Sequence, residues 1–158
     1  MYVAALNNHV LVIVELLRAK AYINQWGHLK NTPLFAAIAG GNTDAIGALL
    51  AAKADIHHQN TIGDQPIHAA TCYVTSTIEQ IILLLEAKAD VNATNECGQT
   101  PLDAARIRGS QDVVAFLEEL QRPTPATARP QFGLVQALTV QNNGTVAEQD
   151  LHIAAATG

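Results

Sequence analysis

Large aliphatic residues recur along this chain in short groups that have helical spacing. Residues 46–50 and 81–85 place isoleucine and leucine side chains three and four positions apart, which is the pattern of one helix face. An alanine-rich stretch precedes each group, as at Ala36-Ala37 and Ala69-Ala70. The pattern predicts pairs of short helices, in which the first helix is rich in small residues and the second carries the larger ones.

The pairs repeat at a nearly constant period. Pro33, Pro66 and Pro101 each open an alanine-rich stretch, and they lie 33 and then 35 residues apart. The same two steps separate three lysines that follow the aliphatic groups: Lys20, Lys53 and Lys88. Because both markers gain two residues together, the sequence predicts a two-residue insertion near residues 73–75, in the turn between two helices.

The residues at the ends of each predicted helix suit those positions. Proline fits the first turn of a helix, where its missing N–H forms no helical hydrogen bond in any case. Gly41 marks a turn between helices, and the acid Asp44 follows in the first turn of the next helix, where a negative charge favours the helix dipole. The polar stretch 92–100, with Gly98 inside it, predicts a tight, hairpin-like loop between units.

These features resemble the ankyrin repeat, most clearly in residues 83–93 (LLLEAKADVNA) and 98–102 (GQTPL). The resemblance implies an all-α fold, an ankyrin-repeat solenoid of stacked helix-turn-helix units with hairpin-like loops. It covers residues 1–120, with units at about 1–24, 25–57, 58–92 and 93–120. The first of these units begins inside its first helix and is therefore incomplete.

The chain departs from the family where a second helix ends. The family usually has a glycine there in the left-handed conformation, and this chain has Lys20, Lys53 and Lys88. A residue other than glycine in that conformation costs about 1–2 kcal/mol. Lys30 likewise stands where the next two loops have Gly63 and Gly98. We expect either strained lysines or turns of a different shape.

The repeat pattern stops near residue 120. Prolines interrupt residues 121–147, which predicts an extended linker, and the apolar stretch 132–140 within it suits a strand or a helix equally well. Residues 148–158 contain Leu151-His152-Ile153 and resemble the start of a further ankyrin unit. The alternative is a short, alanine-rich helical tail. The incomplete first unit and this restart both favour a longer parent chain.

Composition narrows the class of protein. The chain has 158 residues, of which 49% are hydrophobic and 15% charged, so it has the composition of a folded domain and not of a disordered tail. Its net charge of −5 gives no electrostatic case for nucleic acid, and no apolar run approaches the about 20 residues of a membrane span. Cys72 and Cys97 lack any ligand spacing and indicate reduced thiols. Without a signal peptide, we expect a cytoplasmic monomer, with the nucleus or a host-cell cytosol as alternatives.

We find no set of residues that points to catalysis, a cofactor or a metal. The chain has no phosphate-binding glycine motif and no zinc-ligand pattern. His57-His58 beside Asp55 comes nearest to a metal site, but adjacent histidines on an extended stretch point apart, so we expect a solvated loop. The resemblance implies that His68 hydrogen-bonds neighbouring backbone. We therefore expect no enzyme.

A repeat array offers its surface to partners. By the resemblance, the binding positions are the loop tips and the ends of the first helices, on the concave face. Carried over, the tips supply Trp26, His28, Leu29, Asn31, Gln59, Thr61, Ile62, Asp64, Thr94, Glu96 and Gln99. The first helices supply Leu6, Asn7, Cys72, Tyr73, Ile107 and Arg108. Trp26 is the leading hot-spot candidate, and the alternative is that it packs between adjacent loops.

We therefore expect a protein–protein interaction module that binds another protein through its concave face and loop tips. The alternatives are a regulatory or targeting segment of a larger multidomain enzyme or secreted effector, and a spacer with no partner on that face. One modification follows from the resemblance as well. Asn92, after Asp90-Val91, has the context in which ankyrin asparagines are hydroxylated by a cytosolic dioxygenase.

Overall fold

The computed structural model describes residues 1–108 and 111–122, and within them the chain is helical and contains no strand. The helices are α1 (Tyr2–Leu6), α2 (Val10–Arg18), α3 (Pro33–Ala39), α4 (Thr43–Ala51), α5 (Pro66–Cys72), α6 (Ile78–Glu86), α7 (Pro101–Arg108) and α8 (Gln111–Gln121), with one 3-10 turn at His28–Lys30. None of the helices in these two ranges is long and apolar enough to cross a membrane. The expected all-α architecture is confirmed.

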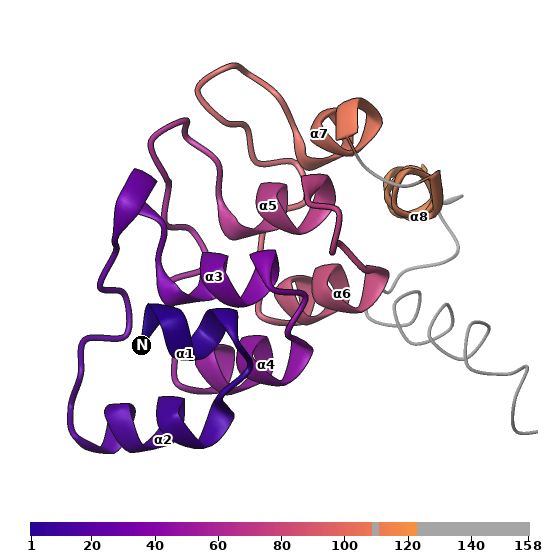
Figure 1. The fold of residues 1–158 in the computed structure, drawn as a ribbon. Helices are drawn as coiled ribbons and strands as arrows, with labels where there is room; N and C mark the ends of the chain where they lie inside the picture. The colour runs from indigo at the N-terminus through magenta and orange to yellow at the C-terminus, as the bar shows by residue number, and fades with distance from the viewer. Residues whose placement is uncertain (109–110, 123–158) are drawn as a thin grey trace, which may run out of the picture. The chain divides into compact units, whose positions relative to one another are not determined.

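The helices form two layers of stacked pairs. The first helices α1, α3, α5 and α7 pack one on the next, and α2, α4 and α6 form the second layer, as Figure 1 shows. Backbone contacts divide the chain into Met1–Glu119, to which this stack belongs, and Leu120–Gly158. The predicted linker at 121–147, beyond residue 122, and the predicted further unit at 148–158 lie outside the described residues.

Small apolar residues pack in the first helices and large ones in the second helices, as the pattern predicts. One alanine per unit lies at the same point of each first helix and is buried: Ala4, Ala37, Ala70 and Ala105. Ile13, Ile46 and Ile81 occupy matching positions in the second helices, and each has no exposed surface. Alanine lets first helices approach closely, while isoleucine fills the space between the layers.

The predicted insertion is confirmed in place and length. Residues 40–42 join α3 to α4, whereas residues 73–77 join α5 to α6, which makes the second turn two residues longer. All helices around it keep their stacking order, so the extra residues extend only the turn.

The second helices end in strained lysines, and the turns keep their shape. Lys20, Lys53 and Lys88 have φ values of 59°, 65° and 76°. In the middle case the Lys53 N–H donates to the Leu50 carbonyl and the Ala54 N–H to the Leu49 carbonyl, at 3.0 and 2.9 Å. The same two bonds recur at the other lysines. This is the hydrogen-bond pattern of a glycine-terminated helix, so each lysine bears the expected strain.

Polar side chains in the turns tie each unit to the one before it. The Asn42 side-chain amide donates to the Ala5 and Leu6 carbonyls at the end of α1, at 2.9 and 2.7 Å. Thr75 Oγ1 repeats this contact one unit later, donating to the Ala39 carbonyl at 3.0 Å. These side chains satisfy carbonyls that a helix end leaves free, and the repeat pattern did not predict these bonds.

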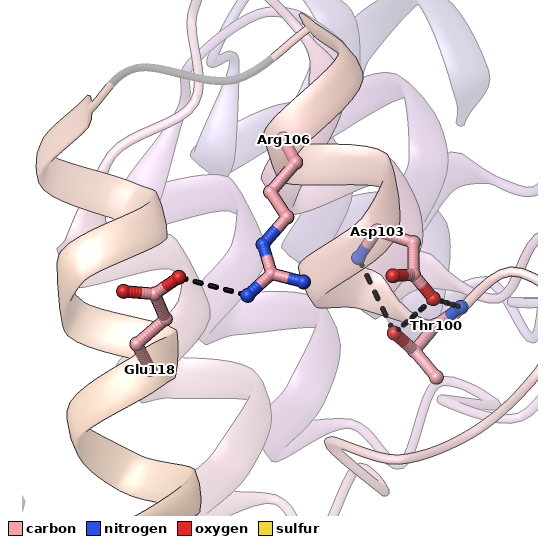
Figure 2. Close-up of polar contacts among 4 residues, drawn as sticks. All are labelled: Thr100, Asp103, Arg106 and Glu118. Atoms are coloured by element: carbon pink, nitrogen blue, oxygen red, sulfur yellow. Dashed lines mark hydrogen bonds and ion pairs between the residues drawn. The ribbon is translucent and has the colours of Figure 1, made fainter.

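The last helix pair is held by two polar contacts, which Figure 2 shows. Asp103 Oδ2 accepts from the Thr100 N–H and hydroxyl at 2.9 and 2.7 Å, while the Asp103 N–H donates to Thr100 Oγ1 at 3.2 Å. Arg106 donates to Glu118 Oε1 at 2.9 Å and so links α7 to α8. Arg106 therefore remains exposed while it forms this surface ion pair.

The Thr100–Asp103 contact predicts a pH-dependent stability. Hydrogen bonds from the Thr100 backbone and hydroxyl lower the pKa of Asp103 below its ordinary value. The contact therefore stabilises the fold above the pKa of the unfolded carboxyl, near 3.9, and the stabilisation is lost as pH falls through the lower folded pKa. Because Asp103 is partly exposed and water screens its contacts, Asp103→Asn should lower the free energy of unfolding at pH 7 by less than about 1 kcal/mol.

Urea unfolding of both proteins between pH 7 and about pH 2.5 measures this cost. The difference in unfolding free energy between the wild type and Asp103→Asn should shrink as the solution is acidified below pH 4. A difference that stays constant across this range would contradict the role of the charged carboxylate.

Candidate partner-binding surface

Three loops of one design connect the four helix pairs. In each loop an N–H donates to the carbonyl four residues later: Gly27 to Asn31, Asn60 to Asp64 and Asn95 to Gln99, all at 3.0 Å. A second bond closes the tip, as from the Gly63 N–H to the Asn60 carbonyl at 3.1 Å. The predicted hairpin-like loops are thus present, and they follow one another along the same side of the stack (Figure 1).

Two asparagines shape the second and third loops from inside. Asn60 Oδ1 accepts the N–H groups of Ile62 and Asp64, both at 3.0 Å. Asn95 Oδ1 does the same for Cys97 and Gln99, at 3.0 and 2.9 Å. Asparagine favours such local bonds to backbone two residues ahead. Their equal distance from Gly63 and Gly98 was the sequence signal for this role.

The first loop lacks that asparagine and is shaped differently. Gly27 stands in its place, so backbone N–H groups at the tip have no internal side-chain acceptor there. The tip closes as the 3-10 turn, with Leu29 at φ 58° and Lys30 at φ 55°. A left-handed Lys30 was one of the two predicted alternatives, and the left-handed Leu29 was not predicted. Strained residues of this kind cluster at binding sites.

Hydrogen bonds join neighbouring loops into one ridge. The Thr61 N–H donates to the Leu29 carbonyl at 3.0 Å, between the first and second loops. The Asn95 side-chain amide donates to Asp64 Oδ1 at 2.8 Å, between the second and third. A partner would therefore meet a continuous surface and not three separate tips.

Two histidines form further hydrogen bonds to backbone carbonyls of these loops. His68 is fully buried, its Nδ1 accepts the Gln65 N–H at 3.2 Å, and its Nε2 therefore donates to the Gln99 carbonyl at 3.1 Å. The predicted backbone-bonding role of His68 is confirmed. His58 is half-buried, contacts the Phe35 ring edge-on and bonds the Lys30 carbonyl at 2.8 Å. The prediction of a solvated loop was wrong for His58, because His58 packs against Phe35 and bonds the Lys30 carbonyl.

The structure exposes most of the predicted binding residues. The exposed ones are Leu6, Asn7, Trp26, His28, Leu29, Gln59, Thr61, Ile62, Thr94, Glu96, Ile107 and Arg108. Asn31, Asp64 and Gln99 are half-buried at the ends of their loops, where the latter two take part in the loop bonds above. Trp26 keeps 51% of its surface exposed, so it is not enclosed between loops.

Exposed apolar side chains gather on the first two tips. Trp26 and Leu29 are each 51% exposed and Ile62 is 56% exposed. The tips also carry Lys30 and His28, whereas the third tip carries Glu96, so the ridge runs from an apolar and basic end to an acidic end. Apolar residues on a polar rim are typical of contact surfaces.

The first helices contribute Cys72 and Tyr73, both half-buried. Burial raises the pKa of the Cys72 thiol, and the Asp64 carboxylate raises it further. Burial likewise raises the pKa of Tyr73. A thiol with a raised pKa remains protonated at neutral pH and is a poor nucleophile.

The structure also bears on the residues considered for metal binding and for modification. In residues 1–108 and 111–122, no group of three histidine, cysteine or acidic side chains is arranged to hold a metal ion. Asn92 is exposed and its N–H donates to Asp90 Oδ1 at 2.9 Å. Its hydroxylation stays a prediction.

Comparison with known proteins identifies the repeat. The family model described as ankyrin repeats, in three copies, matches residues 1–95 and again residues 41–127. No curated protein matches the chain.

Proposed function

The chain belongs to the ankyrin-repeat family, and from this premise we propose that it binds another protein through its loop ridge. Ankyrin repeats are generally protein–protein interaction modules. The observation that carries the proposal is the placement of Trp26, Leu29 and Ile62 on two adjacent tips, each with about half of its surface exposed. Burying such side chains against a partner is the usual source of hot-spot affinity.

The ridge is suited to bind a partner and not to catalyse a reaction on it. Its backbone is fixed by the Asn60 and Asn95 side chains and by the bonds between loops, so little conformational entropy is lost on binding. The first helices extend the surface through Tyr73 and Ile107. Because the surface is apolar to mildly charged, we propose a binding role without catalysis or a cofactor.

Trp26→Ala combined with Ile62→Ala should abolish most partner affinity. Loss of a hot-spot pair costs about 2 kcal/mol or more, which is about 30-fold in the dissociation constant. We would immobilise the wild type and the double variant, and take as partner only a protein that the wild type retains and the variant loses. The dissociation constants of both would then be measured with that purified protein.

Val74→Ala is the matched control, because Val74 is fully exposed in the turn between α5 and α6, away from the loop tips. It should bind as the wild type does. Tyr73→Ala reports whether the contact extends to the first helices. Equal retention by the wild type and the Trp26/Ile62 variant, with both folded by circular dichroism, would overturn the ridge as the binding site.

We also propose a cytoplasmic setting. Both cysteines are free, Cys72 half-buried and Cys97 exposed, and unpaired cysteines are typical of reducing compartments. A fluorescent fusion that enters a secretory compartment would contradict this placement.

A further inference from the structure

The first loop differs from the other two at the two positions that close a tip. Gly27 stands where they have an asparagine, and Lys30 stands where they have a glycine. The first difference removes a side-chain oxygen from inside the loop. The second adds an ammonium group, together with a left-handed backbone that glycine would adopt without strain. Each difference gives up local stability, and each makes the tip more positive.

The missing asparagine leaves one backbone donor open. In the second loop Asn60 Oδ1 accepts the N–H groups of Ile62 and Asp64, both at 3.0 Å. The equivalent donors in the first loop are the N–H groups of Leu29 and Asn31. The Asn31 N–H turns to a carbonyl of its own loop at 3.2 Å. The Leu29 N–H has no acceptor among the residues that the structure describes.

The place of the absent side chain is empty. A Cβ added at Gly27 would meet no heavy atom within 4 Å, and Gly27 itself has a φ of −116°, which is not left-handed. An oxygen atom brought by another molecule therefore has room to take the position that an asparagine oxygen has in the other two loops. There it would accept the Leu29 N–H.

The side chains of this tip suit an anion that is joined to an apolar group. Lys30 and His28 are exposed, and the described part of the chain contains no ion pair of Lys30. Trp26 and Leu29 are each 51% exposed on the same tip. The third tip carries Glu96 instead. An anion is therefore attracted to the first tip and repelled at the third.

We propose that the first tip binds a carboxylate of the protein partner, from an aspartate or glutamate that lies next to an apolar residue. This inference rests on the proposed function of the ridge and names the chemistry of its partner. A carboxylate oxygen is an sp² acceptor like the asparagine oxygen, so it accepts the Leu29 N–H in the same way, and the Lys30 ammonium balances its charge. The apolar neighbour packs on Trp26 and Leu29.

Titration of two blocked pentapeptides into the full chain tests the proposal. One is acetyl-Gly-Leu-Glu-Leu-Gly-amide, and the other has glutamine in place of the glutamate. Trp26 is the single tryptophan, so its fluorescence measures binding at this tip. The acidic peptide should bind about 5-fold more tightly than the neutral one. In NMR spectra the Leu29 amide proton should move downfield as the carboxylate accepts it.

Two variants give the first tip the residues of the other loops. Gly27→Asn supplies the internal oxygen and Lys30→Gly removes the cation and the strain, so both should fold at least as stably as the wild type. Each should reduce the preference for the acidic peptide to less than about 2-fold. Gly27→Ala adds a side chain without an acceptor, and Lys53→Gly removes a left-handed lysine outside the tip. Both controls should keep the preference.

Two results would rule out the carboxylate site. One is equal binding of the two peptides, or binding of neither up to about 10 mM. The other is a preference for the acidic peptide that Gly27→Asn leaves unchanged. Both results concern the first tip alone and leave the ridge as a protein-binding surface. Equal retention of a partner by the wild type and the Trp26/Ile62 variant would instead remove the ridge itself, so the two proposals fail separately.

Discussion

Replacing His68 with phenylalanine should lower the free energy of unfolding by about 1–3 kcal/mol, because it leaves two partly buried backbone groups without their hydrogen-bond partner. The His68 ring joins the Gln65 N–H to the Gln99 carbonyl, and it thereby fixes the third loop on α5. A phenylalanine, Phe35, occupies the equivalent position one unit earlier, so the main loss at His68 is that of the two hydrogen bonds. Urea unfolding measures the change through the midpoint and the slope.

His57→Phe is the control, since His57 is exposed in the preceding loop. A substitution at such a surface position changes stability by less than about 0.5 kcal/mol. Phe35 shows that a phenylalanine fits the equivalent place one unit earlier, where its ring packs edge-on against His58. If His68→Phe were as mild as the control, the buried histidine would be a packing residue alone.

Replacing Lys20 and Lys53 with glycine should stabilise the protein. Each lysine has a left-handed backbone, which costs about 1–2 kcal/mol without glycine. Glycine also increases the entropy of the unfolded chain, which offsets about 0.5–1 kcal/mol of the relief at each site. The double variant should therefore gain about 1–2 kcal/mol, which raises the melting temperature by about 4–10 °C in a domain of this size.

Ala19→Gly with Ala52→Gly makes the matched comparison. These residues directly precede the two lysines and have right-handed φ values of −75° and −82°. Glycine there relieves no strain and should cost about 0.5–1 kcal/mol at each site. Calorimetric melting of both double variants tests this prediction. If the protein with glycine at Lys20 and Lys53 melts no higher than the wild type, the two lysines are not strained.

The proposed surface shows how far residue types alone could lead. Trp26 and Ile62 were candidates because each lies at a loop-tip position of the repeat. The structure shows that both are exposed. Asn31, Asp64 and Gln99 have the same phase, yet the structure half-buries them at the loop ends. The position of a residue within the repeat predicts that it lies on a loop. The direction of its side chain depends on bonds such as the one between Asn95 and Asp64.

Leu29 illustrates a conformation that the sequence did not predict. Its left-handed backbone lies in the loop that has Gly27 where the other two loops have Asn60 and Asn95, and the sequence shows this difference without showing what those asparagines bond. The contacts of His58 with the Phe35 ring and the Lys30 carbonyl were likewise not predicted. Each was a relation between residues far apart in the chain.

The sequence by itself determined the helix pairs, their period, the two-residue insertion and the lysines that end the second helices. These features depend on local chemistry, in which proline, alanine, glycine and acids act within one or two helical turns. The tertiary structure decided which equivalent positions are covered. Val3 and Ala36 share one place in the repeat, but only Ala36 has a helix packed against it. Burial is a property of neighbours, and neighbours are assigned only when the units stack.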